Sequence, residues 1–473
     1  MNKDILNPKL PVTSSLCLVI IFIMTIISEW ASYTVAAVIA VIALIVFTVI
    51  EWQRFDLTAK SLASITAIFT LILSLSSQIT LQELSVICNS VAFFSFLLIA
   101  LGVLKDAALT SNSIRLTGLA LLEQKPTRRY AMLTVTAHIL GILMSLGSVN
   151  LLGTMVQQGL SHNSKAIDPR IEQARKRRMM MAVMRGFCSI PLWAPTSVTI
   201  ALLVTTIPKL QWTDILPYGL YITLAMLLFG AWLDYIKAPK NLRHLVPAIS
   251  SDLSDLKVSL PIGIVVITLA ILSAALIVAT PLRPISTVLI SAPIVSAAWI
   301  FMQFHHRHNK TISAQLTVRR FQKQVFQRLP LQRSEILFFA CSIAIGRLLL
   351  SVLDLDWIAV QLAYLNMSPT SILISASWTI ILCSFVFINP MISVTVMAGV
   401  LSKLPGVESM PVTIALVMMV TWAVVAGISP FTATVRVGAK LIGVSPVQLG
   451  LAWNGWYSVF VLVVLDIFII ALI

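Results

Sequence analysis

Two asparagines and two prolines interrupt long apolar stretches of this sequence at corresponding places. Asn150 precedes Pro195 by 45 residues, and Asn389 precedes Pro430 by 41 residues. Proline removes a backbone donor and clashes with the preceding turn, so each proline predicts a broken helix. Carbonyl, amide and hydroxyl oxygens at such a break suit a hard cation such as Na⁺, and the N-terminus of the following half-helix suits an anion.

The candidate binding residues share neutral oxygen atoms and lie at these interruptions. They are Ser148, Asn150, Thr196, Ser197, Asn389, Ser393, Thr395, Ser429, Thr432 and Thr434. The predicted structural helix breaks are Pro191, Pro195, Pro390 and Pro430. A single serine or threonine in a membrane helix ordinarily bonds to its own backbone or joins two helices. The matched pairs of asparagines and prolines favour a binding site, with a candidate Na⁺ position near Asn150 and Asn389.

The amino-acid composition indicates whether these residues lie in a soluble protein or in a membrane protein. Of its 473 residues, 58% are hydrophobic and 11% are charged, and the mean hydropathy is +0.95. Soluble domains have roughly 45–50% apolar and about 25% charged residues. This balance excludes a soluble domain, a disordered chain and a nucleic-acid-binding domain. Continuous apolar runs of about 20 residues predict an all-α polytopic membrane protein.

The distribution of positive charge predicts the orientation of the chain. The formal net charge is +15, and the cations gather between apolar runs, in segments 105–130, 165–185, 237–257 and 304–333. Cytoplasmic loops carry an excess of Lys and Arg, so these segments are assigned to the cytoplasm. This assignment places the N-terminus in the cytoplasm and the C-terminus in the periplasm, in a bacterial inner membrane.

Two apolar stretches do not fit single spans under this assignment. The stretch 131–159 begins and ends on the cytoplasmic side, and two arms of about 14 residues would each reach only ~20 Å into a core of about 30 Å. We therefore expect a re-entrant hairpin that turns at Ser145–Asn150. The stretch 369–402 is interrupted at Phe387–Pro390 and predicts a second hairpin, which enters from outside. The alternative for 131–159 is one ordinary span.

These elements predict two inverted repeats. We expect about 11 transmembrane helices in addition to the two hairpins. The spacing after the breaks also matches, because Gly219 follows Pro195 by 24 residues and Gly455 follows Pro430 by 25. The expected segments are N-terminal scaffold helices 1–60, a first repeat 61–235 with hairpin 131–159 and broken helix 186–207, a linker and spanning helix 236–285, and a second repeat 286–473 with hairpin 369–402 and broken helix 411–435. Paired hairpins and broken helices are typical of a secondary transporter with a site near mid-membrane.

At these residues the chain resembles the ion transporter superfamily, and within it the divalent anion:sodium symporters that carry dicarboxylates. The second repeat carries Ile388-Asn389-Pro390 at the hairpin tip and Ser429-Pro430-Phe431-Thr432 at the turn. The first repeat carries Gly147-Ser148-Val149-Asn150 and Ala194-Pro195-Thr196-Ser197. The resemblance implies a scaffold domain, a mobile transport domain, a homodimer and an elevator mechanism. It extends more distantly to the large permease subunit of tripartite periplasmic transporters.

The sequence therefore predicts a secondary active transporter for a small, carboxylate-like anionic solute, driven by Na⁺ or H⁺. Expected partners are the solute, membrane lipid and a second copy of the chain, with no nucleic acid and no cofactor beyond Na⁺ as a candidate coupling ion. An integral-membrane transferase and a lipid-linked carrier flippase are the alternatives from other classes. An enzyme would require Asp, His or Glu grouped at one membrane face. The six histidines show no such spacing, so no enzymatic activity is expected.

Overall fold

A computed structural model of the chain describes residues 12–122, 124, 126–163, 169–237, 260–305 and 309–472. All regular elements in these ranges are helices. The chain divides into two compact units. Unit 1 comprises residues up to Thr110 together with Ile267–Leu353, and unit 2 comprises Ser111–Val266 together with Asp354–Ile473.

Unit 1 is built around one helix that is apolar on every side. Its helices are α1 (Val12–Ala31), α2 (Thr34–Glu51), α3 (Leu57–Leu75), α4 (Leu81–Leu109), the larger part of α11 (Leu260–Ala279), α12 (Pro284–His305), α13 (Lys310–Arg320), α14 (Phe326–Arg328) and α15 (Arg333–Val352). α4 packs against α1, α2, α12 and α15 and is buried along most of its length, as expected for a helix without a polar face.

Ion pairs join the polar ends of the unit 1 helices. The side chain of Glu51 is fully buried, accepts a hydrogen bond from Ser14 Oγ at 2.6 Å and lies 3.7 Å from Arg333. Asp106 on α4 lies 3.6 Å from Arg320 and 3.7 Å from Arg328. A buried carboxylate is stable only when it is paired or hydrogen-bonded, so these contacts hold α1, α2 and α4 against α13, α14 and the first residue of α15.

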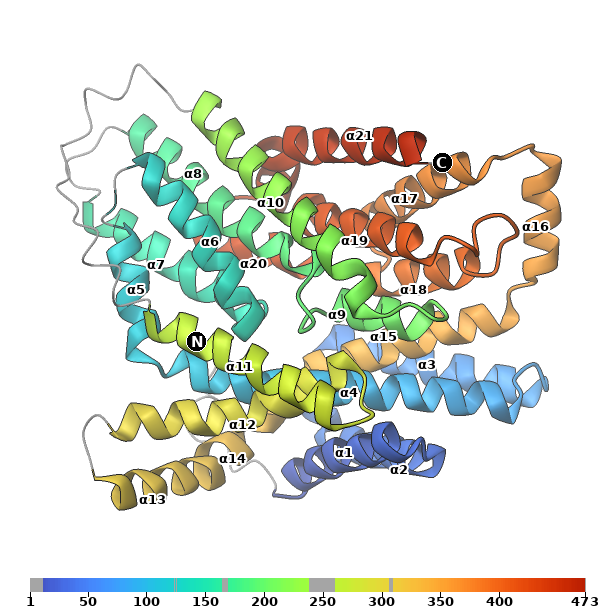
Figure 1. The fold of residues 1–473 in the computed structure, drawn as a ribbon, viewed down its shortest axis with the longest axis horizontal. Coiled ribbons are helices and arrows are strands. Elements are labelled where there is room, and N and C mark those ends of the chain that lie inside the picture. The colour runs from blue at the N-terminus through green and yellow to red at the C-terminus, as the bar shows by residue number, and fades with distance from the viewer. Residues whose placement is uncertain are drawn as a thin grey trace. The chain divides into compact units, whose positions relative to one another are not determined.

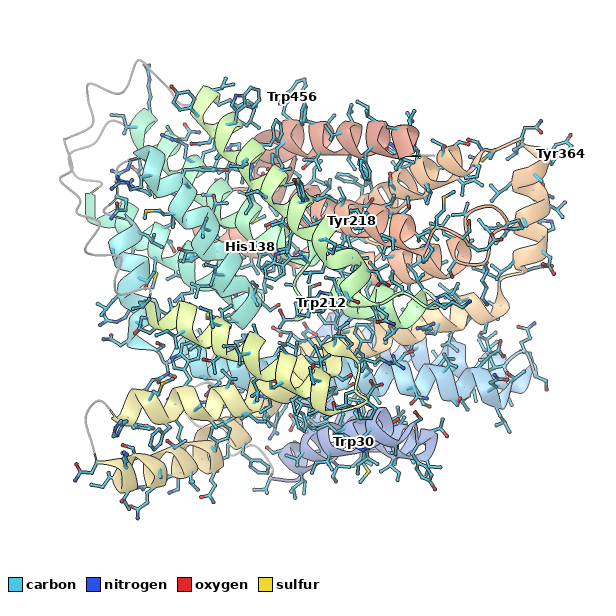
Figure 2. All side chains as sticks on the ribbon, viewed as in Figure 1. Trp30, His138, Trp212, Tyr218, Tyr364 and Trp456 are labelled. Atoms are coloured by element: carbon cyan, nitrogen blue, oxygen red, sulfur yellow. The ribbon has the colours of Figure 1, made fainter. Side chains whose placement is uncertain are left out.

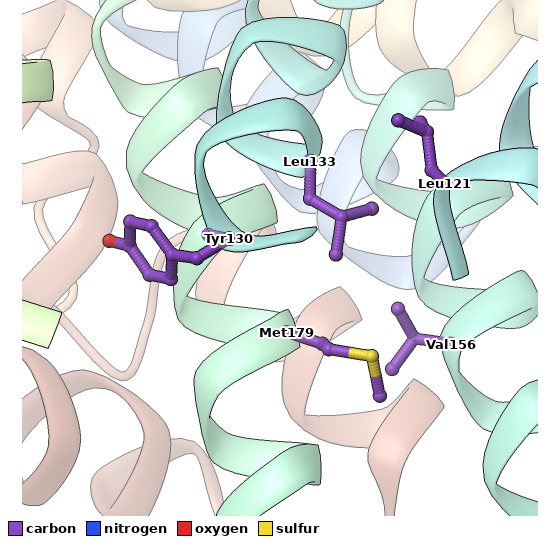
Figure 3. Close-up of a cluster of buried hydrophobic side chains, with 6 residues drawn as sticks. Leu121, Tyr130, Leu133, Val156 and Met179 are labelled. Carbon is purple, nitrogen blue, oxygen red and sulfur yellow. The ribbon is translucent and has the colours of Figure 1, made fainter. Parts of the chain in front are cut away.

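Unit 2 begins with a helical pair and a broken helix (Figure 1). The helices are α5 (Asn112–Leu122), α6 (Pro126–Met144), α7 (Gly147–Asn163), α8 (Pro169–Cys188), α9 (Val198–Thr206) and α10 (Trp212–Lys237). Figure 3 shows the core in which α5, α6, α7 and α8 meet, formed by Leu121, Tyr130, Leu133, Val156 and Met179 with Ala182. This apolar contact holds α6 and α7 against α8.

The second half of unit 2 has the same order of elements. After α16 (Leu355–Tyr364) come the pair α17 (Pro369–Phe385) and α18 (Pro390–Leu401), then α19 (Pro411–Ile428), α20 (Ala433–Ile442), a π-helical turn at Gln448–Trp453, and α21 (Asn454–Leu472). α16 and α17 meet at a bend of 115°. Each half of unit 2 thus contains a helical pair, a long helix followed by a short one, and a final long helix.

The chain is an all-α polytopic membrane protein. In the described ranges, 10 helices are long and apolar enough to cross a membrane, or 11 if the bent pair α16–α17 counts as one span. α6 and α7, with 19 and 17 residues, are not among them. The predicted broken helix 186–207 contains the interruption, because α8 ends at Cys188 and α9, with 9 residues and a length of about 14 Å, begins only at Val198.

The structure places turns inside both predicted hairpins. α6 ends at Met144 and α7 begins at Gly147, with Ser145 in the left-handed region at φ 50°. The turn is therefore shorter than the predicted Ser145–Asn150, and Asn150 lies in the first turn of α7. In the second stretch α17 ends at Phe385 and α18 begins at Pro390.

The compact units do not follow the predicted repeat boundaries at 60, 235 and 285. Each unit is assembled from two separate stretches of chain, and both hairpins and both broken helices belong to unit 2. Residues 238–259, which include most of the predicted cytoplasmic segment 237–257, lie outside the described residues. The inverted orientation of the repeats stays a prediction.

Cysteine labelling tests whether α6 and α7 form a re-entrant pair. Arg128 and Gln158 are exposed and flank the pair, whereas the exposed Glu408 lies between α18 and α19. Cys88 and Cys383, the two native cysteines that are not buried, are first replaced by serine. In this background, Arg128→Cys and Gln158→Cys should react with a membrane-impermeant thiol reagent only from the cytoplasmic side. Glu408→Cys should react only from outside. Labelling of the first two positions from opposite sides would establish a single span.

Candidate functional site

The first candidate site is the interruption between α8 and α9. A 3₁₀ turn at Ile190–Leu192 and a bend follow the end of α8, and α9 begins only at Val198. Pro191 and Pro195 lie inside this segment and cannot donate the backbone hydrogen bonds that would continue a helix. The predicted break is therefore present. The long helix that precedes it is α8, which lies largely in the basic segment 165–185 that the charge distribution assigns to the cytoplasm.

Side chains from neighbouring helices bond to backbone carbonyls near this break, and two of them, His138 and Trp212, are labelled in Figure 2. Trp212 Nε1 donates to the carbonyl of Trp193 at 2.8 Å, and Thr223 Oγ1 lies 3.5 Å from the carbonyl of Ser189. His138 Nδ1 lies 3.1 Å from the carbonyl of Gly186. The carbonyl of Ser189 also accepts from the backbone N–H of Leu192, and that of Gly186 also accepts from Ser189 Oγ. These bonds matter because an unpaired carbonyl in lipid costs several kcal/mol.

The hydrogen bonds of His138 define its protonation state. The indole N–H of Trp193 can only donate, and it lies 2.9 Å from His138 Nε2. Nε2 therefore carries no proton, and the proton of the neutral ring is on Nδ1, which lies 2.9 Å from Ser189 Oγ and 3.1 Å from the carbonyl of Gly186. Both ring nitrogens are engaged, so His138 acts as a packed, neutral side chain rather than a proton relay.

The second candidate site is the interruption between α19 and α20. Pro430 cannot bond to the carbonyl of Ala426, and Thr432 Oγ1 approaches that carbonyl at 3.3 Å and the carbonyl of Ser429 at 2.9 Å. Asn454 Nδ2 donates to the carbonyl of Gly427 at 3.1 Å. The two breaks therefore share one feature. Polar side chains, some of them from the next long helix, donate hydrogen bonds to backbone carbonyls near a proline.

Two glycines allow the last helix of each half to approach its break. A Cβ at Gly219 of α10 would clash with the carbonyl oxygen of Leu192, and a Cβ at Gly450 would clash with the carbonyl oxygen of Ile428. The sequence spacing had paired Gly219 with Gly455, but a Cβ at Gly455 would have no neighbour within 4 Å. The structural counterpart of Gly219 is therefore Gly450, in the π-helical turn, which shifts the register between the halves.

The two breaks lie close together within unit 2. A Cβ at Gly427, just before the second break, would lie 3.4 Å from Sγ of Cys188, the last residue of α8. In addition, α9 packs against α18 and α20 packs against α7. The short arm of each broken helix thus contacts the second hairpin helix of the other half, a reciprocal arrangement that the sequence did not reveal.

Most of the predicted site hydroxyls bond to the backbone. The residues concerned are Ser148 (to Ser145 O, 2.9 Å), Ser197 (from Ile200 N, 3.2 Å), Ser393 (to Asn389 O, 3.2 Å), Thr395 (to Met391 O, 2.6 Å), Ser429 (to Ser384 O, 2.7 Å) and Thr432. A hydroxyl that donates to a carbonyl keeps its lone pairs. Those that donate can still accept or coordinate a cation, but they have no further proton to offer an anion.

Thr196 and Thr434 differ from these residues. Each side chain is 6% exposed, and neither hydroxyl makes a hydrogen bond to another residue of the described ranges. Thr196 precedes the first turn of α9, and Thr434 lies in the first turn of α20. Two buried hydroxyls at the N-termini of the two short arms are therefore the best candidates for contact with a solute.

The two asparagines lie in different surroundings. Asn150 is exposed on α7, the helix that packs against α20. Asn389 is half-buried and caps α18 by accepting a hydrogen bond from the backbone N–H of Met391 at 3.0 Å. They belong to different helix pairs, so a cation position near each remains a prediction.

Within the described residues, no group of three His, Cys, Asp or Glu side chains could hold a metal ion.

Sequence reasoning missed a buried arginine that joins the halves of unit 2. Arg185 of α8 is 5% exposed, donates to Asn454 Oδ1 at 3.1 Å, to Tyr130 OH at 3.0 Å and to the carbonyl of Gly230 at 3.1 Å. Its guanidinium also lies 4.4 Å from the ring centre of Tyr457. The sequence offered only the basic run at 175–178, which is typical of a loop.

Comparison with solved structures finds chains that resemble this one in fold. No protein-family model and no curated protein matches the chain. The Alcanivorax borkumensis YdaH transporter, whose crystal structure is described as having an unusual topology, aligns over 80% of this chain and 84% of its own, with a TM-score of 0.46 and 16% identity. A likeness at this level does not define a function.

Alanine substitutions test the close approach at the second break. Gly450→Ala should destabilise the protein by about 1–3 kcal/mol, because the added methyl group meets a backbone carbonyl that cannot rotate away. Gly455→Ala is the matched control and should be neutral or stabilising, since alanine is the better helix former. Thermal unfolding of the two purified variants measures this difference, and equal melting temperatures would refute the close packing.

Proposed function

We propose that this protein is a secondary active transporter, with its solute site at the two breaks of unit 2. One observation carries the proposal: two broken helices of an apolar, membrane-spanning chain meet beside their breaks within one compact unit. In hydrocarbon, non-helical backbone persists only where protein, water or ligand satisfies it. Paired broken helices with neighbouring hairpins are the arrangement by which secondary transporters build a site at mid-membrane.

The chemistry of the two breaks favours an anionic, carboxylate-like solute. Each short arm directs the N–H groups of its first turn toward its break, and helix N-termini attract negative charge. Thr434 adds a hydroxyl in the first turn of α20, and the capping residue of that helix, Thr432, makes no side-chain bond to its N–H groups. Residues 183–207 and 411–442 contain no Asp or Glu that would repel an anion.

Coupling to Na⁺ or H⁺ completes the proposal. Backbone carbonyls and hydroxyls that already donate their proton, as at Ser393 and Ser429, retain lone pairs suited to Na⁺. We propose that unit 2 is the moving unit of an elevator mechanism, in a homodimer of the bacterial inner membrane, since both breaks lie in that unit. The resemblance to the divalent anion:sodium symporters belongs to the same proposal, as does the permease subunit of a tripartite transporter as an alternative.

Replacing the two buried hydroxyls tests the site. In proteoliposomes, a panel of small mono- and dicarboxylates identifies a solute whose uptake requires Na⁺ or a proton gradient. Thr196→Val and Thr434→Val should each lower the affinity for this solute about tenfold or more, because each removes a hydrogen bond to a charged group.

Thr421→Val is the matched control for these variants. Its hydroxyl is buried in α19 and donates to the carbonyl of Val417 at 2.7 Å, away from the break. Uptake by this variant should remain close to wild type. Wild-type affinity in both Thr196→Val and Thr434→Val, with correctly folded protein, would exclude the breaks as the solute site.

Asn389 provides a test that separates binding from helix capping. Asn389→Ala should abolish uptake and also remove the cap, at a cost of about 1 kcal/mol in stability. Asn389→Ser restores the cap without the amide group. If the amide contacts solute or ion, Asn389→Ser should recover the melting temperature but not transport. Recovery of both would assign Asn389 a purely structural role.

A further inference from the structure

A basic cavity lies in unit 2 between α8, α10 and the π-helical turn before α21. Its volume is about 230 Å³. The residues that line it are Ala174, Arg177, Arg178, Met181, Arg185, Leu233, Asp234, Lys237 and Trp453. Arg178 binds Asp234 through two nitrogens, Nε at 3.0 Å and Nη2 at 2.6 Å from the carboxylate oxygens.

The cavity retains an excess of positive charge after this ion pair is formed. Four cations (Arg177, Arg178, Arg185 and Lys237) face one carboxylate, Asp234, which leaves a formal charge of +3 on the described lining. Arg185 uses Nε and Nη1 for bonds within unit 2, while its Nη2 bonds to no residue of the described ranges. Three cationic groups are thus available to one ligand.

The cations of the lining also act on one another. Burial, and then the neighbouring charge of Arg185, lowers the pKa of Arg177, which lines the cavity, while Asp234 acts in the opposite direction. A group of cations that lower one another's affinity for protons gains stability when an anion binds among them. The cavity is also smaller than the roughly 300–1,000 Å³ of pockets for drug-sized ligands, so it fits a compact anionic group rather than a whole organic ligand.

Exposed aromatic residues place the cavity at the edge of the membrane. Trp232 and Tyr235 near the end of α10 are each 56% exposed. Trp456 near the start of α21, labelled in Figure 2, is 76% exposed. Trp and Tyr concentrate at the level of lipid headgroups, and basic pockets between membrane helices bind anionic headgroups. We propose that this cavity binds the phosphate group of an anionic phospholipid from the membrane around it.

Lipid titration of the purified full-length protein tests the proposal. The probes are phosphatidylglycerol and cardiolipin, with phosphatidylcholine as the zwitterionic comparison and inorganic phosphate and glycerol phosphate as soluble sources of the same group. Native mass spectrometry counts bound lipid, and thermal unfolding in detergent measures the stabilisation that binding to the folded protein produces. We expect the anionic lipids to bind and to raise the melting temperature, and phosphatidylcholine to do neither.

The double variant Arg177→Gln/Lys237→Gln removes two of the available cations and leaves the Arg178–Asp234 pair and Arg185 in place. Its affinity for the anionic lipids should fall about 30-fold, from the typical contribution of two basic residues at a lipid surface. Arg128→Gln is the matched control, because Arg128 is exposed on α6 and does not line the cavity. This variant should bind like the wild type.

Each outcome decides the proposal. Lipid binding that the double variant weakens and the control does not would support it. Equal binding by wild type and double variant would overturn it. If inorganic phosphate or glycerol phosphate stabilises the wild type but not the double variant while the lipids have no effect, the cavity takes a soluble phosphate compound, and the lipid assignment is wrong.

Discussion

Backbone carbonyls that lose their helical donors must find other donors when water is absent, and this constraint governs unit 2. At the first break the donors come from His138, Trp212 and Thr223. At the second they come from Thr432 and Asn454. Each break is satisfied in part by side chains on other helices, such as Trp212 and Asn454, and therefore depends on the packing of its neighbours. The candidate site is therefore a product of the whole unit.

Arg185 connects the second break to the basic end of α8. Its guanidinium bonds to Asn454 Oδ1, while the amide nitrogen of Asn454 donates to the carbonyl of Gly427. A buried charge is costly unless it is hydrogen-bonded, and Tyr130 and Tyr457 contribute to its environment. The residue that helps orient Asn454 at the break also lines the basic cavity, so the two regions share one side chain.

The two halves of unit 2 solve the same packing problem with different residues. Gly219 and Gly450 both allow a long helix to approach the carbonyl that precedes a break, although they stand in different positions relative to their prolines. Gly450 lies in the π-helical turn at Gln448–Trp453, whereas Gly219 lies within α10. The matched prolines located the breaks in the sequence, but equal spacing did not identify equivalent contacts, because the glycine that contacts each break lies at a different distance along the chain from its proline.

The sequence by itself determined the membrane class, the helical content and the sites of the breaks, because hydrophobic runs and prolines act locally. It could not determine that α8 is a helix through a basic segment, since the partners that accept its arginines, such as Asp234 and Asn454, are distant in the chain. Nor could it separate hydroxyls bonded to backbone from those left available, as at Thr196 and Thr434. That distinction depends on which carbonyl lies within reach, and only the tertiary structure decides it.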